Sequence, residues 1–273
     1  MAPMKVDTGT DQLTCEVVQR VAVITLSRPE ARNALSDELT KALRQQIAER
    51  GHDPAVGALL ITGAGKAFCS GGDVKGMGGR RSPDGQTPDE RFQTMRARHH
   101  EIAGALTDLR KPTIAALPGA AAGAGLAIAL ACDLRIAARS AFVSTGYARI
   151  GLSGDYGIAW MLTRAVGPAR ARELMLLCER ITAERAETLG LVNRVVEDDV
   201  LYPEAMKLAV QVANGPAVAL GYIKDNLDEA LEIDHHAAID REAERLIRAS
   251  GSEDHREAVA AFVEKREPTF KGR

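Results

Sequence analysis

The stretch KPTIAALPGAAAGAGLAIALACDLRIAA, residues 111–138, decides between a membrane-spanning fold and a globular one. Its residues 113–132 carry no charge over the length of a membrane-spanning helix. Yet the stretch is rich in alanine and glycine, contains Pro118, and has few of the large apolar side chains that drive insertion. Lys111 and Asp133 flank it in a way that also fits a strand, a turn and a helix inside a globular protein. We therefore expect a buried strand–turn–helix and no membrane span.

The segments around this stretch alternate between strand and helix patterns. The run VAVITL at residues 21–26 is β-rich and ends before Pro29, and ALLITG at residues 58–63 is typical of a buried strand. Between them, Ser36 is placed to cap a helix. The apolar face of that helix is Leu35, Leu39, Leu43 and Ile47, and a second predicted helix carries Phe92, Met95, His99, Ile102, Leu106 and Leu109 on one face. Further short strands are predicted in DLRIAA (133–138) and AFVST (141–145).

The pattern changes to helices alone beyond about Tyr202. Strands mixed with helices, followed by helices only, indicate an α/β core with a helical appendage. We place the core at residues 1–200 and the helical region at residues 201–273.

Composition excludes several classes of protein. The 273 residues are 45% hydrophobic and 26% charged, which is enough to bury a sizeable core. A formal net charge of −2 gives no electrostatic case for nucleic acid. The four cysteines lack CxxC or metal-ligand spacing, so reduced thiols in a cytosolic protein are the simplest account and no metal site is expected. The N-terminus lacks the apolar core of a signal peptide, and we expect a cytoplasmic location.

Two glycine loops are candidates for binding an anionic oxygen. The first is SGGD, residues 70–73, and the second is GAAAGAG, residues 119–125, which opens a helix. Glycines let a ligand approach backbone N–H groups, and the first N–H groups of a helix have no internal partner. Two such loops could form an oxyanion hole, although each alone is more often a tight turn. A dinucleotide loop of the short-chain dehydrogenase kind is rejected, because no tyrosine is followed four residues later by lysine.

Five segments follow one another along the chain: SRPEARNAL, AFCSGGDVKGM, residues 111–138, IGLSGDYGIAWMLTRAVG and AFVEKREPTF. Taken in this order, they resemble the enoyl-CoA hydratase/isomerase (crotonase) family. The resemblance runs from about Val21 to Lys271. It implies a core of ββα turns wound into a spiral, and a C-terminal helical region that builds homotrimers, often paired into hexamers. It also implies an acyl-CoA thioester substrate, with coenzyme A as part of the substrate and no further cofactor.

The resemblance also assigns roles to residues. The two oxyanion-hole N–H groups would belong to Gly72 and Ala124, and a backbone donor does not depend on the side chain. Phe262 and Lys265 would close over coenzyme A, on this subunit or a neighbouring one. The remaining residues that would line the coenzyme A channel are Arg28, Ala31, Arg32, Gly71, Asp73 and Val74.

The departures from the family pattern point to one aspartate. Typical hydratases of the family use two glutamates, but Ala127 and Tyr147 stand at those positions here. Asp155, in IGLSGDYGIAW (150–160), lies where dienoyl-CoA isomerases and ring-opening isomerases of the family carry a catalytic aspartate. An apolar pocket would raise the pKa of its carboxyl. The alternative is that Asp155 caps a helix beginning at Tyr156. Tyr156 and Trp160 would line the acyl pocket or be ordinary core aromatics.

Moving a double bond needs one acid/base group and an oxyanion hole, so one aspartate suits isomerisation of an enoyl- or dienoyl-CoA best. The first rival is an enoyl-CoA hydratase that uses Asp155 and a positioned water. The second is an acyl-CoA-binding protein without catalysis. His99 is expected to be a core or pocket-lining residue, Tyr147 and Arg149 to donate hydrogen bonds in the pocket or at its rim, and Cys69 to be a buried small residue rather than a nucleophile.

Overall fold

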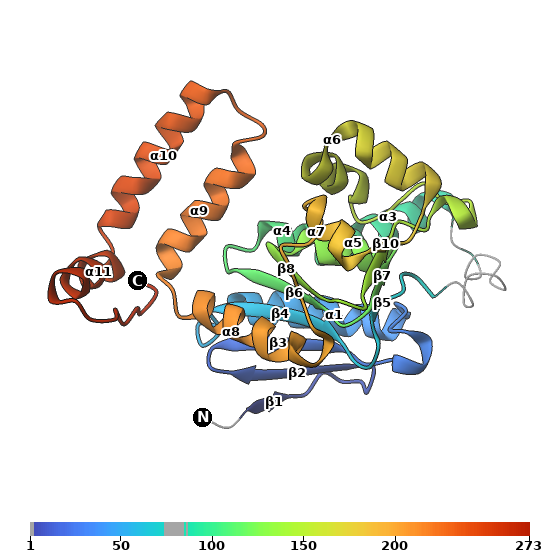
Figure 1. Cartoon of the computed structure of the whole chain (residues 1–273), viewed down its shortest axis with the longest axis horizontal. Coiled ribbons are helices and arrows are strands. Elements are labelled where there is room, and N and C mark those ends of the chain that lie inside the picture. Colours follow the sequence, from blue (N-terminus) through green and yellow to red (C-terminus); the bar gives the residue numbers. More distant parts are fainter. Residues whose placement is uncertain (1–2, 74–84, 86) are drawn as a thin grey trace.

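The computed structural model describes residues 3–73, 85 and 87–273. Its described part contains two sheets flanked by helices (Figure 1). The seven-stranded sheet has the order β1 (Met4–Val6), β2 (Leu13–Val18), β3 (Val21–Leu26), β4 (Ala58–Gly63), β6 (Thr113–Leu117), β8 (Leu134–Ala138) and β11 (Arg194–Val196). The four-stranded sheet has the order β10 (Ile181–Thr182), β9 (Phe142–Ser144), β7 (Ala120–Ala122) and β5 (Ala67–Cys69).

The chain repeats one unit along these sheets: a strand in the large sheet, a strand in the small sheet, then a helix. Strands β4, β6 and β8 pair in parallel in the large sheet. Strands β5, β7 and β9, which follow them in the sequence, pair in parallel in the small sheet. The carboxyl ends of β5, β7 and β9 therefore lie at the same edge. The helices after these pairs include α3 (Pro88–His99), α4 (Ala105–Asp108), α5 (Ala124–Ala131) and α6 (Ile158–Leu177).

Several predicted elements are confirmed, because their patterns are local. Strands β3 and β4 cover the predicted segments without a shift. Helix α1 (Asp37–His52) begins after Ser36, whose hydroxyl accepts a hydrogen bond from Leu39 N at 3.1 Å. The apolar positions Leu39, Leu43 and Ile47 are buried. No helix in the described ranges is long and apolar enough to cross a membrane.

The predicted apolar face of the second helix is wrong at its start. Phe92 and Met95 are 60% and 54% exposed, whereas Ile102 and Leu106 are buried. Helix α3 buries none of its own residues, and burial begins only in the π-helical turn His100–Gly104 between α3 and α4. Because such a turn holds an extra residue, side chains before and after it no longer share one face.

The C-terminal helices divide into one that packs on the body and three that leave it. Helix α8 (Leu201–Ala213) lies against the large sheet and buries Ala205 and Ala209. Helices α9 (Ala217–Glu229), α10 (His235–Ser250) and α11 (Glu253–Glu264) extend away from the sheets, and we call them the arm (Figure 1). A short helix, α7 (Ala183–Thr188), precedes β11.

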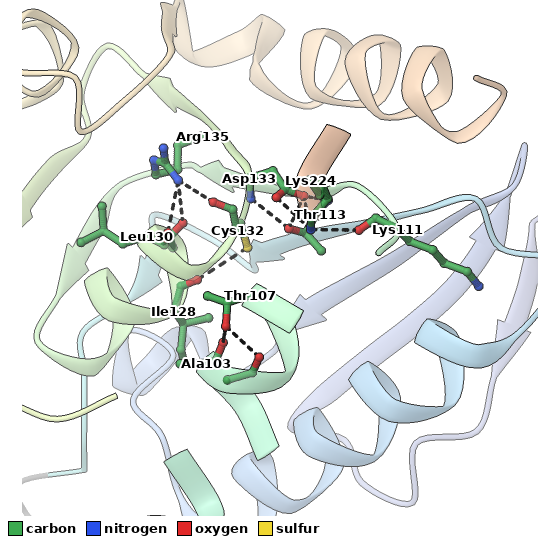
Figure 2. Close-up of polar contacts among 12 residues, drawn as sticks. Ala103, Thr107, Lys111, Thr113, Ile128, Leu130, Cys132, Asp133, Arg135 and Lys224 are labelled. Carbon is green, nitrogen blue, oxygen red and sulfur yellow. Dashed lines mark hydrogen bonds and ion pairs between the residues drawn. The ribbon is translucent and has the colours of Figure 1, made fainter. Parts of the chain in front are cut away.

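A polar cluster anchors the arm to the body. One carboxylate oxygen of Asp133 accepts hydrogen bonds from Thr113 N at 2.7 Å and Thr113 Oγ1 at 2.9 Å. Lys224 of α9 donates to the same carboxylate at 2.8 Å, and Figure 2 shows Lys224 and Thr113 converging on it. The first residue of strand β6, the residue before strand β8 and the arm are thereby joined at one point.

Candidate active site

The two glycine loops meet at the edge where β5 and β7 end. A Cβ added to Gly71 would lie 2.9 Å from Ala122 O and 3.6 Å from Ala124 N. Gly71 and Gly123 have φ angles of 97° and 53°, in the left-handed region that glycine tolerates. Their close approach therefore depends on glycine in both loops. The strand pairing predicts this meeting, because β5 and β7 are parallel neighbours.

The backbone N–H of Gly72 points away from Leu35, the residue with which Gly72 forms a parallel bridge. Leu35 N donates to Gly71 O at 2.9 Å, and Asp73 N donates to Leu35 O at 3.4 Å. In such a parallel bridge, the N–H of the residue between them faces the opposite side. No described residue accepts a hydrogen bond from Gly72 N, so this donor is available to a ligand.

Ala124 supplies a second donor beside the first. It is the first residue of α5, after Gly123, and no side chain caps this helix start. The N–H of a first helical residue has no acceptor within its helix and lies at the positive end of the helix dipole. Two N–H groups from adjoining loops form the arrangement that stabilises an oxyanion.

Asp155 reaches the same edge through Tyr147, which follows β9. The Tyr147 hydroxyl donates a hydrogen bond to Asp155 Oδ1, and the tyrosine side chain is buried. Tyr147 also lies beside the second glycine loop, since a Cβ added to Gly123 would lie 4.0 Å from Tyr147 Cζ. Asp155, Tyr147 and the two N–H donors thus belong to one cluster.

The alternative that Asp155 caps the following helix is wrong. Helix α6 begins at Ile158 after Gly157, and no side chain caps it. Tyr156 and Gly157 have φ angles of 50° and 77°, which no helix start at Tyr156 could include. The carboxylate is turned to Tyr147 instead.

Burial sets the electrostatics of the cluster. It raises the pKa of the Asp155 carboxyl above its ordinary value, and the hydrogen bond from Tyr147 acts in the opposite direction. Burial, and then the charge of Asp155, raise the pKa of Tyr147, so its hydroxyl stays protonated and remains a donor. Burial also raises the pKa of the Cys69 thiol to about 12, so it stays protonated at neutral pH. Of these side chains, the carboxylate of Asp155 is the one that can accept a proton.

His99 and Tyr156 form an aromatic pair beside Asp155. Their ring centroids are 4.1 Å apart. Burial, with the nearby charges of Arg98 and His100, lowers the pKa of His99, so its ring is neutral at pH 7. Tyr156 is buried, whereas Trp160 is exposed and lies against the Arg164 guanidinium at 3.6 Å. Trp160 is therefore no core aromatic.

Comparison with known proteins identifies the family of this chain. The family model described as enoyl-CoA hydratase/isomerase matches residues 16–273. The chain belongs to the enoyl-CoA hydratase/isomerase family. This family acts on acyl-CoA thioesters, and the chain is an enzyme of it.

Some relatives in the family are named isomerases and others are named hydratases. The 1,2-epoxyphenylacetyl-CoA isomerase of Escherichia coli K12 is 38% identical over 94% of this chain and 97% of its own. The crotonyl-CoA hydratase of Syntrophomonas wolfei is 31% identical over 95% of this chain and 98% of its own. The crystal structure of an enoyl-CoA hydratase from Polaromonas sp. JS666 superposes with a TM-score of 0.88, at 34% identity over 94% of this chain and 99% of that one. The predicted crotonase-like α/β fold is confirmed.

Most residues that the family resemblance assigns to the coenzyme A channel lie around the first glycine loop. Arg28 donates to Asp73 Oδ2 at 3.2 Å and to Ala34 O at 2.6 Å. Ser70 N donates to Arg32 O at 3.0 Å, and Ser70 Oγ to Ala31 O at 3.3 Å. These contacts tie the segment after β3 to the loop after β5. Val74 lies outside the described residues.

Phe262 and Lys265 lie apart from this cluster within one chain. Phe262 belongs to α11 and is 85% exposed, and Lys265 ends that helix. Helix α11 lies across the molecule from β5, β7 and α3 (Figure 1). A role for these two residues over coenzyme A would therefore have to be played in a neighbouring subunit.

We expect Gly125→Ala to destabilise the fold by about 1–3 kcal/mol or more, because overpacking forces the backbone to shift. A Cβ at Gly125 would lie 2.3 Å from Cys69 O and 2.7 Å from Cys69 Cβ. Urea unfolding measures this loss. Gly251→Ala is the matched control, since its Cβ would meet Arg248 O only at 3.5 Å. Equal stability of the two variants would contradict the tight packing of α5 on β5.

Proposed function

We propose that this enzyme shifts a double bond in an enoyl- or dienoyl-CoA, with Asp155 as the acid/base group and the N–H groups of Gly72 and Ala124 as the oxyanion hole. The observation that carries the proposal is the pairing of one half-buried carboxylate with two free N–H donors. At the positions of the usual family glutamates the chain has buried Ala127 and the hydrogen-bond donor Tyr147. Coenzyme A enters as part of the substrate.

The substrate and the product of this reaction have the same mass, because a proton is only moved from one carbon to another. The thioester oxygen accepts hydrogen bonds from the two N–H groups while Asp155 removes a proton from C2 of a 3-enoyl-CoA. The electron pair of the broken C–H bond spreads over the dienolate, whose negative oxygen the N–H groups stabilise. Asp155 then returns the proton to C4, and the double bond ends between C2 and C3. The raised pKa of Asp155 suits both halves of this transfer.

Hydration of a 2-enoyl-CoA is the second candidate, and the names of several relatives favour it. Hydration requires one group to activate water and another to deliver a proton. Asp155 could serve one of these steps, but Ala127 cannot supply a second carboxylate. Isomerisation, which needs one carboxylate and an oxyanion hole, therefore fits the groups of this site better than hydration does.

A substrate assay separates the two reactions. Purified protein is incubated with 3-enoyl-CoA and, separately, with 2-enoyl-CoA, and the products are followed by ultraviolet absorbance and mass spectrometry. Conversion of 3-enoyl-CoA to 2-enoyl-CoA at constant mass supports isomerisation. Addition of one water to 2-enoyl-CoA, without isomerisation, would replace it with the hydratase assignment.

We further propose that the chain forms a homotrimer or a hexamer through its arm. Exposed apolar side chains that gather on one part of a protein are typical of an association surface. The large exposed apolar side chains of α9, α10, α11 and the connection between α9 and α10 are Ile223, Leu227, Leu231, Ile239, Leu246, Ile247, Val259, Phe262 and Val263.

Sedimentation tests the oligomer proposal. We expect the wild-type chain to sediment as three or six copies, and Leu246→Asp to dissociate it, because a carboxylate buried without a partner is costly. Val200→Asp, a similar change at an exposed side chain outside the arm, is the control. A monomeric wild-type chain would contradict the proposal.

A further inference from the structure

We propose that Tyr147 is the positioning residue of Asp155: its hydroxyl holds Oδ1 and leaves Oδ2 to exchange the substrate proton. The inference deepens the proposed function and rests on it, because it takes Asp155 as the acid/base group. It assigns to Tyr147 an effect on the ionisation and orientation of Asp155, rather than a contact with coenzyme A.

The segment that carries Asp155 cannot position the carboxylate by itself. Gly154, Tyr156 and Gly157 have φ angles of 128°, 50° and 77°, so Asp155 lies between residues of irregular backbone. Its own backbone oxygen accepts from Ile158 N at 3.0 Å, which fixes the main chain but not the side chain. Within the described ranges, the hydrogen bond to its carboxylate comes from Tyr147. The side chain is therefore oriented by a partner outside its own turn.

Tyr147 is itself rigidly held. Its backbone oxygen accepts hydrogen bonds from Ile150 N and Leu152 N, each at 3.0 Å. Two residues earlier, Thr145 Oγ1 donates to Leu174 O of α6 at 2.7 Å. Tyr147 is 4% exposed, and its ring lies beside Gly123 of the second glycine loop. The hydroxyl is thus fixed relative to the oxyanion-hole donors, and it transmits this placement to Asp155.

The other groups near Asp155 do not replace this effect. From β5, Cys69 is a protonated thiol at neutral pH, because burial raises its pKa to about 12. Tyr156 is neutral, since burial and the charge of Asp155 raise its pKa. The charged side chains that face Tyr156 are Arg98 of α3 and Arg44 of α1, and His99 of α3 stacks on its ring.

The direction of the pH effect follows from two opposing causes. Burial raises the pKa of Asp155, and the Tyr147 hydrogen bond lowers it. Removing the hydroxyl leaves burial unopposed, so the carboxyl holds its proton to higher pH. Because the carboxylate is the active form, the acid limb of kcat/KM against pH moves upward, by roughly one pH unit for the loss of a hydrogen bond to a charged group.

The test compares Tyr147→Phe with the wild type across the pH range in which the protein is folded. We expect an upward shift of the acid limb and a lower plateau of kcat, with KM changed little. Tyr222→Phe removes a hydroxyl on α9, outside the site, and should leave the profile unchanged. Because His99 also titrates, the shift should persist in a His99→Gln background. An acid limb that stays in place would overturn the inference, since a merely structural role lowers activity without moving it.

A second measurement separates this inference from the proposed function. Infrared spectra are recorded across pH without substrate, and the spectra of Asp155→Asn are subtracted from those of the wild type. The difference follows the protonation of the Asp155 carboxyl directly. We expect its titration to move to higher pH in Tyr147→Phe. An unmoved titration, with Asp155→Asn inactive, overturns the role of Tyr147 and leaves the proposed function standing. Full turnover by Asp155→Asn removes the proposed function itself, and with it the catalytic meaning of the tyrosine contact.

Discussion

Asp155→Asn should lower kcat by about 10²–10⁴-fold, the range that a positioned acid/base group contributes. Asparagine keeps the shape of the side chain and can still accept the Tyr147 hydrogen bond through its amide oxygen. It cannot take a proton from carbon, so proton transfer stops while the pocket stays intact. The measurement is turnover of an enoyl-CoA together with the Kd of a saturated acyl-CoA. We expect kcat to fall and the Kd to stay within a few-fold of its wild-type value.

The control for this prediction is Asp228→Asn, the same substitution at an aspartate of α9. It should leave turnover unchanged, because Asp228 lies on the arm. Turnover by Asp155→Asn close to that of wild type would mean that another group moves the proton. Acyl-CoA binding without turnover of enoyl-CoA by the wild type would instead point to a different acyl substrate.

Ala124→Pro should lower kcat by about 10²–10³-fold, the cost of removing one oxyanion-hole donor. Proline deletes the backbone N–H and is tolerated at the first position of a helix. Ala124 occupies that position in α5, and the preceding Gly123 has no Cβ to clash with the proline ring. The substitution therefore removes the donor while the helix can still form. Steady-state kinetics and thermal unfolding together separate the loss of the donor from a loss of fold.

The matched control is His235→Pro, which places proline at the first position of α10. Asp234 before it has φ and ψ angles of −75° and 166°, a conformation that suits a residue preceding proline. We expect both variants to stay folded and only the variant at Ala124 to lose turnover. A folded Ala124→Pro enzyme with wild-type kcat would show that this N–H does not stabilise the transition state.

The sequence predicts those parts of the fold whose signals are local. Strand β3 and helix α1 follow from a β-rich run, a serine cap and leucines at helical spacing. The uncharged stretch at residues 113–132 is correctly predicted to begin with a buried strand and end with a helix, but the segment expected to be a turn contains the further strand β7. Phe92 and Met95 suggest a buried helix face, yet α3 buries none of its residues, and no local pattern in the sequence shows this.

The candidate site is predictable only in part. Glycine chemistry marks the two loops, and the family resemblance marks Asp155, but neither predicts that the Tyr147 hydroxyl bonds to its carboxylate. That contact joins residues eight positions apart across a backbone with left-handed residues, where no helical or strand period applies. The family resemblance places Tyr147 where hydratases have a glutamate, and its hydroxyl is expected to donate a hydrogen bond in the pocket or at its rim. The structure identifies the acceptor as Asp155.

The central claim is that two loops and one aspartate act on the same acyl-CoA. A crystal structure of the enzyme with a saturated acyl-CoA, which binds without reacting, tests it most directly. We predict that the thioester oxygen lies about 2.7–3.1 Å from both Gly72 N and Ala124 N, as in an oxyanion hole. Asp155 Oδ2 should face the carbons next to the thioester. A thioester bound away from these N–H groups, or an acyl chain that does not pass Asp155, would contradict the account.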